Sequence, residues 1–293
     1  MKILRYYRNR FHEISEKWIR EHRQDYRGNR TGDLQDAYLV KVNAGEETFT
    51  EQGLAAILRE LFVIGSESES VMMRWAVRII ACYPDVQEKV RAELEAACGR
   101  GVEIVWDKRT QLPYTMAVMK CVLKISARLI YLLSTQGDPA VCRHCSYRTD
   151  PQDSCRHSTS RSASSSSLTS CSVLSSGYSL PSNTLVMCNY SACHRCPEFW
   201  EKPEEFYPEH FLTKEGSLIS DKPGFLPYGV GPRICPGAEL ADMKMFLIIA
   251  NMIATFNLSL PPADDGDLGT QFEAGTAVLR NPKPFRTVFE LRS

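Results

Sequence analysis

The stretch FLPYGVGPRICPG, residues 225–237, places Cys235 in a glycine-rich loop directly before a long apolar segment. Glycine allows the backbone to approach a flat ligand closely and leaves N–H groups free to point at the cysteine sulfur. A helix that begins after Gly237 also favours negative charge at its N-terminus. Both effects favour the thiolate of Cys235, and the thiolate is the form that binds metal ions. The stretch therefore predicts a metal-binding cysteine in a tight loop.

This loop resembles the cysteine-ligand loop of the cytochrome P450 superfamily, FxxGxRxCxG, with Tyr228 standing where the family usually has phenylalanine. The resemblance implies that Cys235 ligates the iron of haem b, where the thiolate pushes electron density onto the metal and favours O–O cleavage. Arg233 can hold a carboxylate through two hydrogen bonds, so the resemblance assigns it to a haem propionate. Tyr228, Gly231 and Gly237 complete the expected cofactor-binding loop.

A second signal lies upstream, in a long run without proline that opens with a capping-box pattern at Thr48 and Glu51. This pattern predicts one long helix. Its middle, GSESES at residues 65–70, is poorly suited to a buried helix interior, so we expect the helix to be interrupted there.

The interrupted segment resembles the oxygen-binding signature of the same family, (A/G)Gx(E/D)T. The resemblance implies that Gly65 opens room over the iron and that Glu67 and Ser68 are the catalytic acid and alcohol that relay protons to bound O2. Serine in place of threonine keeps the hydroxyl but loses the methyl group that restricts its rotamer. The alternative is a helix kink that serine side chains stabilise.

The remaining pattern predicts a mainly α-helical fold with small β elements. Shorter segments resemble the family's strand with a His-Arg sequence, its meander and its C-terminal hairpin, at residues 183–195, 200–212 and 281–285. The resemblance therefore implies the C-terminal part of the cytochrome P450 fold, of the animal microsomal type that oxidises drugs and steroids. The expected elements are helices at 84–99, 115–133 and 238–260, a short strand after 177, and a terminal hairpin at 276–293.

Composition divides the chain into three segments. Residues 1–134 are expected to hold a remnant of a lid helix, the oxygen-side helix and the core helices that follow, and residues 177–293 the meander, the cysteine loop, the C-terminal helix and the hairpin. Residues 135–176 are rich in serine, and little apolar burial offsets an ordering cost of about 1–2 kcal/mol per residue. We predict a disordered insertion there, either real or the product of a gene-model error such as a retained intron.

One family element is rewritten. Cys121 and Lys124 align with the glutamate and arginine of ExxR, and His210 aligns with the arginine of the PERF-like segment that they normally bind. Replacing a buried charge network as a whole is milder than removing one member. We nevertheless expect weaker anchoring of the cysteine loop and lower haem retention.

The overall charge excludes some classes of partner. Lysine plus arginine and aspartate plus glutamate number 35 each, so no net field attracts nucleic acid. The chain has no apolar run long enough to span a membrane, and its 11 cysteines without a secretory signal do not suggest disulfides. The N-terminal helix, residues 1–28, is basic and amphipathic, and it either lies on a membrane surface or packs on its own domain.

The resemblance implies monooxygenation of a small lipophilic substrate with O2, using electrons from NADPH through a flavoprotein reductase at the cytosolic face of the endoplasmic reticulum. We expect the family's membrane anchor and first sheet to be missing from this chain, which leaves a cytoplasmic location open. One alternative is a truncated, catalytically inactive relative. Another is a zinc-binding module, with ligands from the pairs Cys142 and Cys145 and Cys193 and Cys196.

Overall fold

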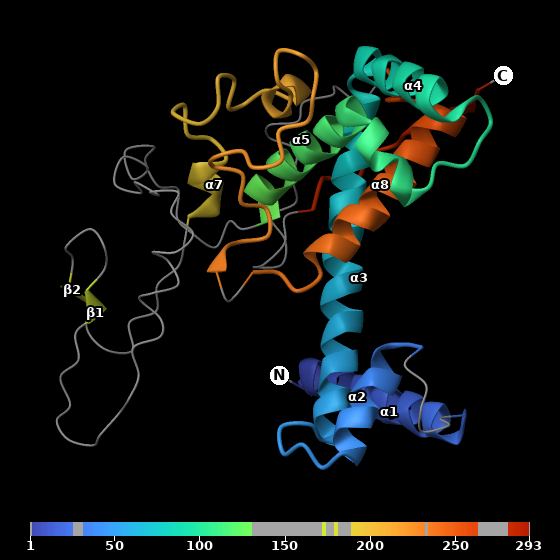
Figure 1. Cartoon of the computed structure of the whole chain (residues 1–293), viewed down its shortest axis with the longest axis vertical. Helices are drawn as coiled ribbons and strands as arrows, with labels where there is room; N and C mark the ends of the chain where they lie inside the picture. Colours follow the sequence, from blue (N-terminus) through green and yellow to red (C-terminus); the bar gives the residue numbers. More distant parts are fainter. Residues whose placement is uncertain are drawn as a thin grey trace. The chain divides into compact units, whose positions relative to one another are not determined.

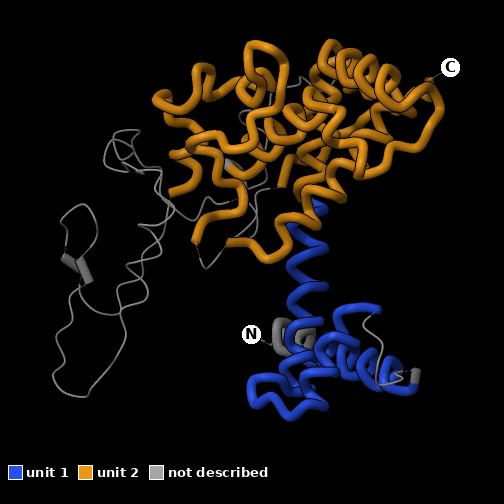
Figure 2. The backbone as a smooth tube through the Cα atoms, viewed as in Figure 1, with its two compact units in different colours: residues 1–70 blue, residues 71–293 orange. Residues whose placement is uncertain are grey.

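The computed structural model describes residues 2–25, 32–130, 172–173, 179–180, 189–231, 234–262 and 281–292. It divides into two compact units, residues 1–70 and 71–293, each considered by itself (Figure 2). The described part is mainly helical with two small antiparallel sheets of two strands each, which confirms the predicted fold class (Figure 1). The predicted segment boundaries, at 134/135 and 176/177, lie outside the described residues.

Most of the serine-rich segment also lies outside the described residues. Within it the structure describes the strand β1 (Ser172–Val173), which pairs antiparallel with β2 (Ser179–Leu180). The predicted short strand after residue 177 therefore corresponds to β2.

The first unit contains α1 (Lys2–Asp25), α2 (Leu34–Asn43) and the beginning of α3 (Glu51–Ala81). Its core forms because each helix presents apolar side chains to the others. The N-terminal helix contributes Ile19, which is 4% exposed, and the rings of Phe11 and Trp18 each lie 5.7 Å from the ring of Phe62 on α3. The amphipathic N-terminal helix thus packs on its own unit. The core residues are Ile19, Tyr38, Leu39, Leu54 and Ala55.

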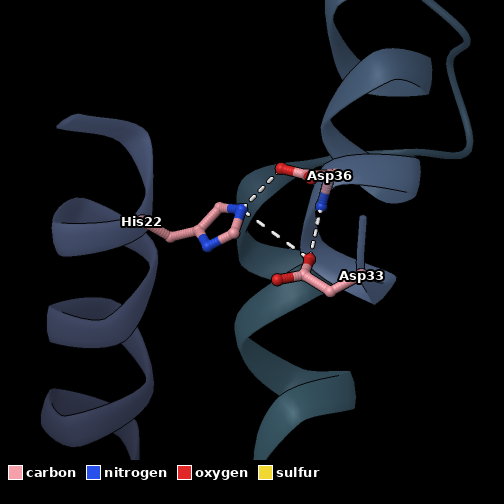
Figure 3. Close-up of side chains that lie close together, drawn as sticks. All are labelled: His22, Asp33 and Asp36. Atoms are coloured by element: carbon pink, nitrogen blue, oxygen red, sulfur yellow. Dashed lines mark hydrogen bonds and ion pairs between the residues drawn. The ribbon is translucent and has the colours of Figure 1, made fainter. Parts of the chain in front are cut away.

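Helix α1 is tied to the start of α2 by a buried carboxylate (Figure 3). Asp36 is 4% exposed, and its two oxygens lie 2.7 Å from His22 Nε2 and 2.9 Å from the N–H of Gly32. Asp33 caps α2, because its Oδ1 accepts the N–H of Asp36 at 2.9 Å. Carboxylates at a helix N-terminus satisfy its unpaired N–H groups and complement its dipole.

Helix α3 corrects two expectations. It is a continuous α-helix from Glu51 to Ala81, so the predicted interruption at 65–70 is wrong. The hydroxyl of Ser68 donates to the carbonyl of Ile64 at 2.7 Å, which satisfies it within the helix. The cap is also two residues later than predicted, because Thr50 rather than Thr48 accepts the N–H of Gly53, at 3.0 Å.

The second unit is built around α4 (Pro84–Cys98), α5 (Pro113–Ile130) and α8 (Ala238–Thr255), which pack with the end of α3. Proline opens α4 and α5 at the position where a missing N–H costs nothing, and Gly99 ends α4 with φ +91°. Shorter elements complete the unit. They are η1 (Trp106–Gln111), α7 (Tyr190–Cys193), η3 (Pro208–Phe211), β3 (Phe256–Ser259) and β4 (Val288–Leu291).

The C-terminal helix ends earlier than expected. We predicted that it continues to the prolines at 261–262, but α8 ends at Thr255 and the chain continues as β3, which pairs with β4. Gln87, 3% exposed, holds β3 on α4 because its side-chain amide exchanges two hydrogen bonds with the backbone of Leu258, at 2.8 and 3.0 Å. The first arm of the predicted terminal hairpin, residues 276–280, lies outside the described residues.

Candidate functional site

The loop before α8 is closed by backbone hydrogen bonds around Cys235. The N–H of Cys235 donates to the carbonyl of Tyr228 at 2.9 Å, and the N–H of Ile234 donates to Gly231 at 3.1 Å. Gly229 and Gly231 turn the chain with φ +78° and +71°, a conformation that side-chain-bearing residues rarely adopt. The glycines are therefore required by the backbone of the turn.

Helix α8 begins immediately after the cysteine. Gly237 is its N-cap, and the carbonyl of Cys235 accepts the N–H of Ala238 at 3.3 Å. Cys235 is partly exposed and is not in a disulfide. A thiol is thus held at the N-terminus of an 18-residue helix, where the dipole favours a bound anion such as a thiolate.

Tyr228 connects this loop to α8 through its side chain. Its hydroxyl donates to Asp242 Oδ1 at 2.6 Å. Burial raises the pKa of Asp242, while the hydrogen bond from Tyr228 and the charge of Lys120 act in the opposite direction. Our reading of the sequence missed Asp242, although the tyrosine at a position where the family usually has phenylalanine was a signal that the loop needs a hydrogen-bond acceptor.

A half-open cavity of about 210 Å³ lies between this loop and α5. The side chains around it are mostly apolar, with Lys120 and Asp242 as charged exceptions. Lys120 Nζ donates to the carbonyl of Ser220 at 3.1 Å, and burial lowers the pKa of Lys120. Residues from the two elements include Met116, Met119, Leu123, Phe225, Pro227 and Ile234.

The structure gathers four of the predicted site residues in one loop, namely Tyr228, Gly231, Cys235 and Gly237. Arg233 lies outside the described residues.

The oxygen-side residues belong to the other unit. Gly65, Glu67 and Ser68 lie in the middle of α3, at the end of the first unit, whereas the cysteine loop belongs to the second. Gly65 and Glu67 are exposed there, and Ser68 makes the helical hydrogen bond described above. Their contribution to one site with Cys235 stays a prediction.

Two of the three residues that replace the family network, Lys124 and His210, contact Trp200. Lys124 is fully buried, donates to the carbonyl of Pro203 at 2.8 Å, and lies 4.6 Å from the centre of the Trp200 ring. The His210 ring packs edge-on against the same indole at 5.2 Å. Cys121 is buried one helical turn before Lys124 on α5. A carbonyl and an aromatic face thus accommodate the lysine charge.

His210 is neutral at ordinary pH. Burial, reinforced by nearby Lys124, lowers its pKa to about 4. Its Nε2 accepts the N–H of Lys202 at 3.2 Å, which also requires an unprotonated nitrogen. His210 therefore does not replace the positive charge of the arginine that is usual in the family.

The zinc alternative stays a prediction, because the structure describes only one of its two cysteine pairs. Cys142 and Cys145 lie outside the described residues, and Cys193 and Cys196 are buried in the second unit. Within the described ranges, the one group of three possible metal ligands is His22, Asp33 and Asp36, which contains no cysteine (Figure 3). Its carboxylate oxygens already accept hydrogen bonds that hold α2, so we interpret this group as structural.

The cysteine loop itself suits a haem. Its donor is a thiol outside any disulfide, and apart from adjacent residues no described atom lies within 4 Å of where a side chain would stand at Gly231 or Gly237. Soft thiolate ligands suit iron, and open space beside small residues lets a flat ring approach the backbone. The residues present therefore fit the group that the sequence predicts.

Comparisons with known proteins agree with the predicted family. The sequence model of the Cytochrome P450 family matches residues 1–132 and 165–289, and the unmatched 133–164 largely coincide with the serine-rich segment. The chain is 29% identical over 279 residues to Cytochrome P450 2L1 of Panulirus argus, an alignment that covers 94% of this chain and 50% of that protein.

Two human proteins give similar values. Identity to Cytochrome P450 2U1 of Homo sapiens is 30% over 250 residues, which cover 84% of this chain and 40% of that protein. Identity to Cytochrome P450 2J2 of Homo sapiens is 29% over 264 residues, which cover 89% of this chain and 45% of that protein. The chain spans about half the length of the curated relatives it matches. Membership of this family implies a haem iron as the cofactor. Because the family model matches most of its residues, and the loop geometry agrees with it, the chain belongs to the cytochrome P450 family.

Proposed function

We propose that this chain provides the iron-ligating part of a haem-thiolate monooxygenase that inserts one oxygen atom of O2 into a small lipophilic substrate. The observation that carries the proposal is the position of Cys235, a thiol without a disulfide, in a glycine-turned loop at the N-terminus of α8. Thiolate-ligated haem supplies the activation of O2, because the ligand pushes electron density toward the iron and favours O–O cleavage.

The residues of the chain have separate tasks in this proposal. Cys235 would ligate the iron, and Arg233 would hold a propionate through paired hydrogen bonds. Gly65 would leave room on the oxygen side, while Glu67 and Ser68 would carry protons to the oxygen. A carboxylic acid and a hydroxyl suit this task because each can accept one proton and donate another.

The proposed partners follow from the family. A flavoprotein reductase would deliver electrons from NADPH, and the activity would lie at the cytosolic face of the endoplasmic reticulum, as the family resemblance implies. Among the described residues, the structure contains no helix that is long and apolar enough to cross a membrane.

A CO difference spectrum, that of the reduced haem-loaded protein with CO minus that without CO, tests the proposal. We expect the red-shifted Soret band of thiolate-ligated haem, lost in Cys235→Ser and retained in the matched variant Cys98→Ser, whose thiol lies at the end of α4. A band that is absent from the unaltered protein, or that survives in Cys235→Ser, would contradict the assignment of this cysteine.

A second candidate is a catalytically inactive relative, which the replaced network around Trp200 favours. With Cys121 in place of the usual glutamate and a neutral His210 in place of an arginine, the ionic contacts between these two positions cannot form. Haem binding of about one per chain with no red-shifted band, or with no NADPH-dependent product from a panel of lipophilic substrates, would support this candidate.

A further inference from the structure

Tyr228 makes two contacts that bracket the cysteine. Through its backbone carbonyl it accepts the N–H of Cys235 at 2.9 Å, and through its hydroxyl it donates to Asp242 at 2.6 Å. Asp242 follows the cysteine on α8, the helix that begins directly after the loop. Tyr228 is therefore hydrogen-bonded both to Cys235 and to α8, the helix that follows the loop.

We propose that Tyr228 and Asp242 are positioning residues, which together hold the Cys235 sulfur in place for metal ligation. The proposal rests on the proposed haem-thiolate function and identifies how this chain stabilises its ligand loop.

The first step of the argument concerns the loop itself. Between Tyr228 and Cys235 the chain turns at Gly229 and Gly231, both in the left-handed region. Glycine costs the most conformational entropy to order, so such a loop opens easily unless its ends are held. The hydrogen bond from the Cys235 N–H to the Tyr228 carbonyl closes the loop, and it holds Cys235 in place only if Tyr228 is itself fixed.

The second step concerns what fixes Tyr228. Its ring packs against the main hydrophobic core of the second unit, and its hydroxyl meets a carboxylate on α8. A hydrogen bond to a charged acceptor is roughly twice as strong as one between neutral groups. Asp242 and Lys120 both line the cavity and their charges attract each other, and Lys120 donates to the carbonyl of Ser220. The anchor therefore extends from the loop to α8 and α5.

The third step concerns the alternative anchor. In this chain Lys124 and His210 are occupied with the Pro203 carbonyl, the Trp200 ring and the Lys202 N–H. These contacts join α5 to residues 200–210 or lie within those residues, outside the segment from Tyr228 to Cys235. The hydrogen bond to Asp242, by contrast, acts directly on that segment.

The test removes only the hydroxyl. In Tyr228→Phe we expect the Cys235 thiol of haem-free protein to be alkylated by iodoacetamide about tenfold faster, the factor that loss of a hydrogen bond to a charged acceptor gives in an opening equilibrium. Mass spectrometry of the Cys235 peptide measures the rate, with Cys98 of the same molecule as internal reference. Amide hydrogen exchange at Cys235 should accelerate by a similar factor.

Two further variants separate positioning from general destabilisation. Asp242→Asn retains an oxygen acceptor and should keep most of the protection of Cys235, whereas Asp242→Leu should match Tyr228→Phe. Because the two residues act through one bond, the double variant Tyr228→Phe with Asp242→Leu should expose Cys235 no more than either single variant. The control is Tyr114→Phe, whose hydroxyl has no hydrogen-bond partner in the described part of the chain.

In haem-loaded protein the same variants should convert part of the red-shifted CO band into the unshifted band of haem that has lost its thiolate. Unchanged alkylation and exchange in Tyr228→Phe, or additive effects in the double variant, would overturn the proposal. The alkylation and hydrogen-exchange measurements use haem-free protein. A failure of the haem-thiolate function would therefore appear as a missing band in the unaltered chain, distinct from a failure of the Tyr228 anchor.

Discussion

Lys124 lies 4.6 Å from the centre of the Trp200 ring, so a fully buried ammonium group rests on an indole face. Trp is the most favourable ring for such a contact, and the carbonyl of Pro203 accepts one of the three N–H groups at 2.8 Å. This pair occupies the place where the family usually has ionic contacts. The effect of substituting single residues of this network on stability can therefore be tested.

Reintroducing one family residue should be harmful. In His210→Arg a second permanent cation would be placed in the environment of Lys124, without the carboxylate that normally separates such charges. We expect the free energy of unfolding to fall by about 3 kcal/mol, the usual cost of a buried unpaired charge. Urea denaturation followed by circular dichroism measures it.

The triple variant tests whether the network acts as a unit. Cys121→Glu, Lys124→Arg and His210→Arg together restore the usual glutamate and arginines, so the combined change should cost less than His210→Arg alone. A triple variant that is less stable than the single variant would show that the pocket around Trp200 no longer accommodates the ionic arrangement.

The same histidine predicts a pH dependence. Burial and the charge of Lys124 lower the pKa of His210 from the ordinary 6.5 to about 4. Between these values the unfolded chain binds the proton and the folded chain does not, so stability falls as the pH drops from 6.5 toward 4. We expect His210→Gln to reduce this loss by about 2 kcal/mol in urea titrations.

Gln87 should be essential for the strand pair at the C-terminus. Its amide bonds the carbonyls of Ile80 and Leu258 and the N–H of Leu258. In Gln87→Ala the carbonyl and N–H of Leu258 lose this partner, whereas the Ile80 carbonyl keeps the N–H of Tyr83, so we expect a cost of about 2 kcal/mol. Hydrogen exchange should accelerate along β3 and β4. The surface variant Gln111→Ala should leave both strands protected.

The cap at Asp33 should stabilise α2 locally. Asp33→Ala removes the acceptor for the N–H of Asp36, and the loss of such a cap costs about 1 kcal/mol. Asp33→Ser keeps an oxygen at the same place and should retain most of the stability. Amide exchange of residues 34–43 in the three proteins provides the comparison, and equal rates would contradict the role of the cap.

Local signals were sufficient for much of the fold. Pro84 and Gly99 mark the ends of α4, and Pro113 opens α5, because these residues act on the backbone where they stand. The cysteine loop was predictable for the same reason, since its glycines are required by its own turns at 229 and 231. In contrast, Thr48 and Thr50 offer similar capping side chains, and local sequence did not distinguish them.

The sequence by itself determined the family, the cysteine at the start of α8 and the mainly helical fold, because spacing, glycine conformation and helix boundaries are properties of contiguous residues. The tertiary structure decided those features whose interaction partners lie far away in the sequence. Phe256–Ser259 is a strand because β4 pairs with it, Lys124 is accommodated because Trp200 lies against it, and Tyr228 becomes an anchor because α8 brings Asp242 to its hydroxyl. Each of these outcomes depends on an approach in space that no local pattern encodes.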